Sequence, residues 1–208
     1  MRKIKPSNEN EMVYEFLKME IDSERYREQI ENILKELQTD RKIITDGNVM
    51  SAKENNLRAE ILKRFRGWRN EELFENFPQN IEWVWTKFDR EDMLKIKYIE
   101  YSYWNELSDY TGSPLEVAKY ILSGKTLFGM KTGGFIENAK WLIEGNKFPP
   151  LIFLTDECES RYIILEGHCR MTAYGLVPVL FQDVSVLLGY CDSVDLEKWY
   201  GKMPERPS

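Results

Sequence analysis

The chain has 208 residues, of which 42% are hydrophobic and 31% charged, a balance typical of a soluble globular protein. No apolar run approaches the ~20 residues that span a bilayer, and no apolar segment follows the basic N-terminus, so we expect a cytoplasmic protein with no membrane partner. The net charge is −6, and the only dense basic stretch covers residues 63–69. Because nucleic-acid binding generally needs a basic face, nucleic acid is an unfavoured partner.

The cysteines are Cys158, Cys169 and Cys191, and they form no CxxC pair. The chain contains a single histidine, so neither the cysteine spacing nor a histidine cluster indicates a zinc site, and we expect no metal-ligating residues. An odd number of cysteines fits a reducing compartment, in which thiols stay free. We therefore predict no disulfide.

Residues 1–80 have the pattern of a helical N-terminal region. Ser7 or Asn8 can cap a first helix, and Ser51 with Glu54 has the spacing of a capping box. After each cap, apolar residues recur three or four positions apart, which is the period of an amphipathic helix. No Gly/Ser- or Pro-rich linker marks the end of this region.

The pattern changes near residue 81. Residues 81–85 and 94–99 alternate between apolar and polar side chains on either side of the polar segment 89–92, which predicts two strands joined by a hairpin turn. Two helices and three further strands should follow, with a short helix after residue 170. The predicted helices carry apolar residues over 115–122 and 135–143, and the predicted strands cover 151–154, 161–165 and 184–188. The sequence thus predicts an α+β domain, residues 81–208, with a small mixed β-sheet.

A short loop in this domain has the residues expected of a phosphate-binding site. The strand over 162–165 runs into Glu166-Gly167-His168-Cys169-Arg170, and a helical segment follows at once. A loop that opens a helix presents unpaired amides and the positive end of the helix dipole to an anion. Gly167 lets the backbone approach a ligand closely, and Arg170 can grip two phosphate oxygens. A histidine packed against the protein, and a glycine that only turns the chain, are the competing interpretations.

The segment from Leu165 to Ala173 resembles the [DE]-G-H-x-R-x-x-A motif of the ParB/sulfiredoxin superfamily, and most closely that of ADP-dependent free serine kinases. The order of elements is similar too: an apolar helix, Pro149-Pro150, a hairpin and then the loop. The resemblance covers about residues 94 to 188. It implies a ParB/sulfiredoxin-like core and leaves residues 1–80 unaccounted for.

In that superfamily the loop binds the phosphates of a nucleotide, which implies ATP, ADP or CTP as ligand, together with Mg²⁺ in the kinases. Glu166 matches the acidic position before the glycine, and Glu100 is the nearest candidate for a second catalytic acid. The resemblance assigns these two as catalytic and the following residues to the nucleotide: Gly167, His168, Cys169, Arg170 and Thr172.

Three functions are consistent with these residues. The leading one is a nucleotide-binding, kinase-like phosphotransferase that acts on a small-molecule acceptor. The second is a non-catalytic nucleotide-dependent switch or protein-interaction module, dimeric through residues 9–38. The third is a thiol enzyme using Cys169, which a helix N-terminus would activate. Sulfiredoxin has its cysteine directly after the glycine, and ParB has an arginine where Cys169 stands, so neither of those two activities is favoured.

Overall fold

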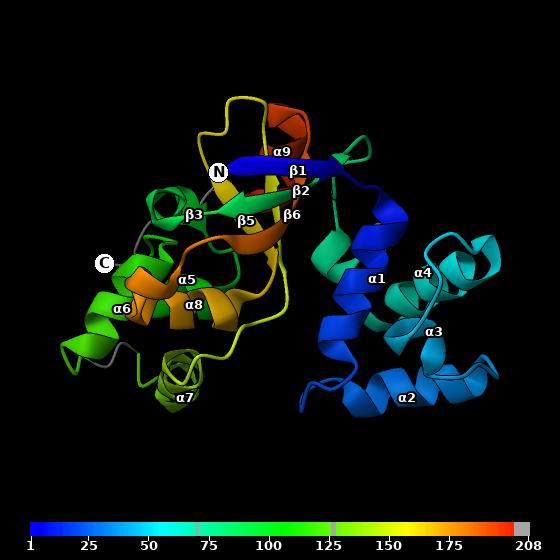
Figure 1. Cartoon of the computed structure of the whole chain (residues 1–208), viewed down its shortest axis with the longest axis horizontal. Coiled ribbons are helices and arrows are strands. Elements are labelled where there is room, and N and C mark those ends of the chain that lie inside the picture. Colours follow the sequence, from blue (N-terminus) through cyan, green and yellow to red (C-terminus); the bar gives the residue numbers. More distant parts are fainter. Residues whose placement is uncertain (70, 126–127, 202–208) are drawn as a thin grey trace.

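The computed structural model describes residues 1–69, 71–125 and 128–201. These residues form a six-stranded mixed sheet with helices on both faces (Figure 1). The α+β class is therefore confirmed. The strands, in their spatial order across the sheet, are β1 (Arg2–Pro6), β2 (Glu82–Phe88), β6 (Val184–Tyr190), β4 (Leu151–Thr155), β5 (Tyr162–Glu166) and β3 (Ile96–Lys97).

Helices fill most of the remaining chain, and none of those described is both long and apolar enough to cross a membrane. The N-terminal helices are α1 (Glu9–Glu20), α2 (Arg27–Glu36), α3 (Lys42–Thr45) and α4 (Ala52–Arg66). The later ones are α5 (Ser102–Leu107), α6 (Pro114–Leu122), α7 (Gly133–Ile143), α8 (His168–Leu176) and α9 (Ser193–Tyr200), with 3-10 turns η1 (Glu72–Phe74), η2 (Arg90–Lys95) and η3 (Pro178–Leu180).

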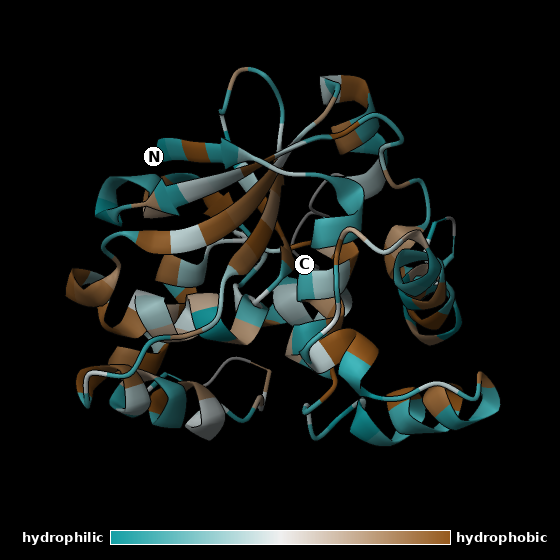
Figure 2. Ribbon diagram, turned by 45° about the vertical axis from the view of Figure 1, so that its right-hand side comes forward, coloured by the Kyte–Doolittle hydropathy of each residue, from teal (hydrophilic) through white to brown (hydrophobic). Residues whose placement is uncertain are grey.

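Each face of the sheet carries its own hydrophobic core, because alternate residues of a strand point to opposite faces. Ile152 and Leu154 of β4 pack with the buried residues of α1 to α4, and Leu151 and Phe153 pack with those of α6, α7 and α8. Figure 2 shows hydrophobic residues along the central strands, with helices on either side of the sheet. The N-terminal helices therefore share a hydrophobic core with the sheet. This core contains residues from both sides of the boundary expected near residue 80.

Local capping explains where α1 and α4 begin. The Asn8 side chain accepts the Glu11 amide (3.1 Å), and Ser51 Oγ accepts the Glu54 amide (3.3 Å). The second half of the expected capping box is absent from the described hydrogen bonds, since the Glu54 carboxylate accepts the Asn48 amide instead (2.7 Å). Gly67, with φ of 72°, ends α4.

The helical N-terminal region also contains a strand that the sequence did not predict, because β1 pairs antiparallel with β2 as an edge strand. The expected hairpin is wrong: β2 pairs with β1 and β6, while β3 pairs parallel with β5 at the far edge. The polar segment between them is the 3-10 turn η2, in which Asp92 accepts the Asp89 amide (2.8 Å).

Candidate functional site

The junction between β5 and α8 is one residue long. β5 ends at Glu166, Gly167 has φ of +103°, and α8 begins at His168. A side chain at Gly167 would place its Cβ 2.4 Å from Leu151 Cδ2, so both the backbone conformation and the space require glycine. The predicted order of strand, glycine and helix is confirmed, but His168 to Arg170 form the first turn of the helix rather than a loop.

The N-terminus of α8 has no side-chain cap. The first hydrogen bond of the helix joins the Met171 amide to the Gly167 carbonyl (2.8 Å), and Gly167 has no side chain that could accept from the amides before it. The first-turn amides of His168, Cys169 and Arg170 therefore remain at the positive end of the helix dipole without a partner inside the helix.

A cavity of about 350 Å³ lies between this junction and the N-terminal helices. Glu166 to Arg170 form one wall, and α1, the α1–α2 connection and α4 form the other. Tyr26, Tyr101 and Trp104 add aromatic surface. The expected nucleotide-binding segment thus lines a cavity whose second wall comes from a region that the sequence motif does not include.

Of the described arginines, three line this cavity: Arg25 from the α1–α2 connection, Arg66 from the end of α4, and Arg170 from α8. The Arg66 Nη1 donates to the Tyr26 hydroxyl (3.1 Å), and its buried Nε has no hydrogen-bond partner among the described residues. Arg25 lies over the ring of the same tyrosine, with its guanidinium 4.7 Å from the Tyr26 ring centroid. These side chains present an anion-binding surface in a chain whose net charge is negative.

Glu20 is a carboxylate of the site that the sequence did not reveal. It lies at the C-terminal end of α1 and lines the cavity. Burial raises its pKa, although Ser23 and the arginines Arg66, Arg170 and Arg25 oppose that shift. At the end of an amphipathic helix a glutamate normally faces solvent, so only the packing of α1 against the β5–α8 junction identifies it.

Arg170 ties the junction together. Its Nη1 donates to the carbonyls of Pro149 (2.8 Å) and Pro150 (2.6 Å), and its Nη2 donates to Glu166. Burial lowers the pKa of Arg170 to about 10, which leaves the guanidinium charged at neutral pH. Glu166 and Arg170, expected as a catalytic acid and a phosphate ligand, are thus paired with each other in this structure.

His168 is packed within aromatic rings. Its imidazole stacks on Trp104 with centroids 4.9 Å apart, and Tyr98 lies 6.0 Å away. Burial, with a further contribution from Arg66, lowers its pKa to about 3. The ring is therefore neutral at physiological pH. Its buried Nε2 meets no hydrogen-bonding atom in the part of the chain that is described.

Cys169 lies at the exposed rim of the cavity. Burial of the thiol by the surrounding protein raises its pKa, and the nearby Glu20 carboxylate raises this pKa further. A thiolate nucleophile needs the opposite shift, so this environment disfavours the thiol enzyme. Cys158 and Cys191 are likewise free in the structure.

Two of the expected residues lie elsewhere. Thr172 is fully buried on the inner face of α8, where its hydroxyl donates to the His168 carbonyl (2.9 Å) and lies 2.7 Å from the Tyr98 hydroxyl. Glu100 lines a separate cavity of about 240 Å³ next to Lys198 and Trp199. The structure brings Glu166 to Arg170 together with Arg25, Arg66 and Glu20, but it places neither Thr172 nor Glu100 among them.

No family model, curated protein or solved structure matches the chain.

Proposed function

We propose that this chain binds the phosphate groups of a nucleotide in the cavity between α8 and the N-terminal helices. The observation that carries the proposal is the convergence of Arg25 and Arg66 with the uncapped N-terminus of α8 on one cavity. Helix amides and guanidinium groups are the donors that phosphate oxygens accept from most readily. The resemblance of residues 165–173 to the nucleotide-binding loop of the ParB/sulfiredoxin superfamily supports the same ligand.

The neutral walls suit the rest of a nucleotide. Tyr101 and Trp104 line the cavity beside the arginines, and a base can stack on exposed aromatic surface. The volume of about 350 Å³ falls within the range of ~300–1,000 Å³ common for small-molecule sites. ATP, ADP and CTP remain the candidate ligands.

A kinase-like phosphotransferase is the catalytic form of this proposal. The hydroxyl oxygen of a small acceptor would attack the terminal phosphorus, the bond to the leaving nucleotide oxygen would break, and the hydroxyl proton would pass to a carboxylate. Glu20 is better suited to accept it than Glu166, because Glu166 is paired with Arg170 whereas the raised pKa of Glu20 favours proton transfer. Mg²⁺ would neutralise the phosphate charge, which is the main requirement of such a reaction.

A nucleotide-dependent switch is the second candidate. Arg25 and Arg66 belong to the N-terminal helices and Arg170 to the sheet domain, so a bound phosphate would link the two parts of the chain. Residues 9–38 are less suited to a dimer, because the apolar faces of α1 and α2 are already buried in the core of the chain itself. Turnover of ATP would distinguish the enzyme from the switch.

A thermal-shift screen of ATP, ADP, CTP and inorganic pyrophosphate, each with and without Mg²⁺, tests the proposal. A ligand at a hundredfold excess over its dissociation constant stabilises a protein by ~2.7 kcal/mol, which is readily measured as a rise in Tm. We expect at least one nucleotide to raise the Tm by several degrees. If all of these compounds leave the Tm unchanged at millimolar concentration, the chain is not a nucleotide-binding protein.

A further inference from the structure

A second cavity, of about 600 Å³, lies beyond the opposite strand ends of the sheet from Gly167. It opens where the parallel strands β4 and β6 end, and the β4–β5 and β6–α9 connections surround it. Because β5 runs antiparallel to β4, the C-terminal end of β5, which leads into Gly167, lies beside the N-terminal end of β4 and away from this cavity. The two cavities are therefore separate sites.

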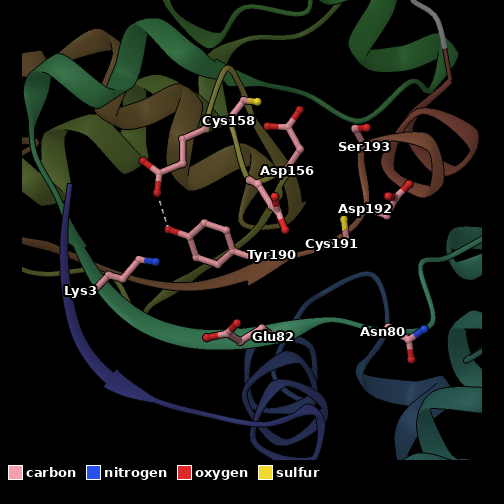
Figure 3. A pocket seen from close by; sticks show the side chains of 11 residues that line it. Lys3, Asn80, Glu82, Asp156, Cys158, Tyr190, Cys191, Asp192 and Ser193 are labelled. Carbon is pink, nitrogen blue, oxygen red and sulfur yellow. Dashed lines mark hydrogen bonds between the residues drawn. The ribbon is translucent and has the colours of Figure 1, made fainter.

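Five of the eleven described residues that line this second cavity are acidic (Figure 3). Lys3 is the only basic residue among the described residues that line it. The carboxylates come from β2, from the β4–β5 connection and from the segment before α9, so they surround the space rather than meet at one point. They are Glu82, Asp156, Glu157, Glu159 and Asp192.

Asp156 is the buried carboxylate among them, and one of its oxygens has no partner among the described residues. Only 8% of the residue is exposed, and its Oδ1 is buried with no hydrogen bond from any described residue. By contrast, Glu159 accepts the Tyr190 hydroxyl (2.6 Å), and Asp192 Oδ1 caps α9 by accepting the Val194 amide (2.8 Å). A buried carboxylate without a donor is costly, and a cation that entered the cavity would relieve that cost.

The cavity already holds one amine of the chain itself. The Lys3 ammonium lies 4.1 Å from the centroid of the Tyr190 ring, which is cation–π geometry. Lys3 belongs to the exposed edge strand β1, so its side chain is free to leave. The surface around Tyr190 thus accommodates an ammonium group, and a ligand amine would compete with Lys3 for it.

We propose that this cavity binds an extended organic cation with several primary or secondary amines, of the linear polyamine type. One ammonium would pair with Asp156 and a second would replace Lys3 over Tyr190. Carboxylates spread around a large space match separated positive charges, whereas a metal ion needs its ligands to converge on one point. The site is independent of the nucleotide cavity, and neither proposal depends on the other.

Calorimetric titration of the full chain with spermidine tests the inference, with Asp156→Asn as the main variant. The amide keeps the shape and removes the charge, so spermidine affinity should fall at least tenfold, as expected for loss of one partner of a buried charge pair. Glu28→Gln removes the same charge from an exposed position on α2 and should leave the affinity within about twofold. Melting curves of both variants report whether they fold.

Lys3→Met provides a second variant. A gain in spermidine affinity is not expected if Lys3 has only a structural role. It removes the competing ammonium and one positive charge, so spermidine should bind about threefold more tightly. Unchanged affinity in Asp156→Asn, weaker binding in Lys3→Met, or equal losses in Asp156→Asn and Glu28→Gln would each overturn the proposal. So would saturable binding of Mg²⁺ alone that requires Asp156 and excludes spermidine, because the cavity would then be a metal site.

Discussion

Arg170 has neighbours in space that its sequence motif does not indicate. The motif implies a phosphate ligand whose removal would leave the fold intact. In the structure its guanidinium instead holds two carbonyls of the Pro149-Pro150 segment and the Glu166 carboxylate. We therefore predict that Arg170→Ala lowers the free energy of unfolding by about 2–4 kcal/mol, because it leaves a partly buried carboxylate and two carbonyls unpaired. Urea denaturation measures this change.

Arg64→Ala is the matched control. Arg64 forms ion pairs with Glu60 and Glu36 on an exposed helix surface, so its loss should destabilise the protein much less than the loss of Arg170. Arg170→Lys should fall between the two, since lysine keeps the charge but cannot bond to three oxygens in the same arrangement. Unchanged stability of Arg170→Ala together with a loss of nucleotide affinity would restore the simple ligand role.

Gly167 allows the cost of a close contact to be separated from the cost of backbone strain. Gly167→Ala should lower the free energy of unfolding by about 2–4 kcal/mol, because alanine is strained at φ of +103° and its Cβ would collide with Leu151. Gly145→Ala has a comparable φ of +89° with no atom within 4 Å, so about 1 kcal/mol is expected there. Equal losses in the two variants would show that the Leu151 contact relaxes without cost.

His168 is the only histidine, which makes its effect on the pH dependence of stability measurable. Its pKa is lowered from 6.5 to about 3 in the folded chain. Between those values the unfolded chain binds a proton that the folded chain does not. The free energy of unfolding is therefore fully retained above pH 6.5 and decreases as the pH falls towards about 3.

The predicted slope in that window is up to ~1.4 kcal/mol per pH unit more than in His168→Phe, which lacks the titrating group. Urea denaturation of both proteins between about pH 7 and about pH 5 measures it. Parallel curves would mean that the imidazole titrates normally and is not held neutral against Trp104.

At the scale of elements, helix ends show which sequence signals were reliable. Ser51→Ala should destabilise the protein by about 1 kcal/mol, because Ser51 Oγ accepts the Glu54 amide. Ser113 precedes α6 with the same apparent signal, but its side chain makes no cap bond, so Ser113→Ala should cost less than about 0.5 kcal/mol. Thermal unfolding distinguishes the two. A larger loss for Ser113 would show that its hydroxyl does cap α6 in solution.

The elements that the sequence predicted are those with local signals. Pro114, Gly124 and Gly145 mark helix ends directly, and the continuous apolar run of β4 reflects burial on both faces. β1 carries no such signal, since Arg2–Pro6 is exposed throughout and is a strand only because β2 offers an edge. The hairpin prediction failed for the same reason, because strand pairing is decided by contacts distant in sequence.

At the scale of the molecule, the candidate site is assembled from both halves of the chain. The glycine junction was predictable because one residue type fits that turn. Arg25, Arg66 and Glu20 were not, because each resembles a solvated residue near a helix end and joins the site only through the packing of α1 and α4 on the sheet. Arg66 even belongs to the basic stretch of residues 63–69, which the sequence did not connect with the loop at Gly167.

Calorimetric titration of ADP and ATP into the wild-type chain, Arg66→Ala and Arg64→Ala tests the central claim most directly. The two variants lose the same charge two positions apart on α4, but only Arg66 lines the cavity. We predict saturable binding to the wild type, at least tenfold weaker binding to Arg66→Ala, and a change of about twofold or less in Arg64→Ala. Equal affinities for all three proteins, or no binding to the wild type, would contradict it.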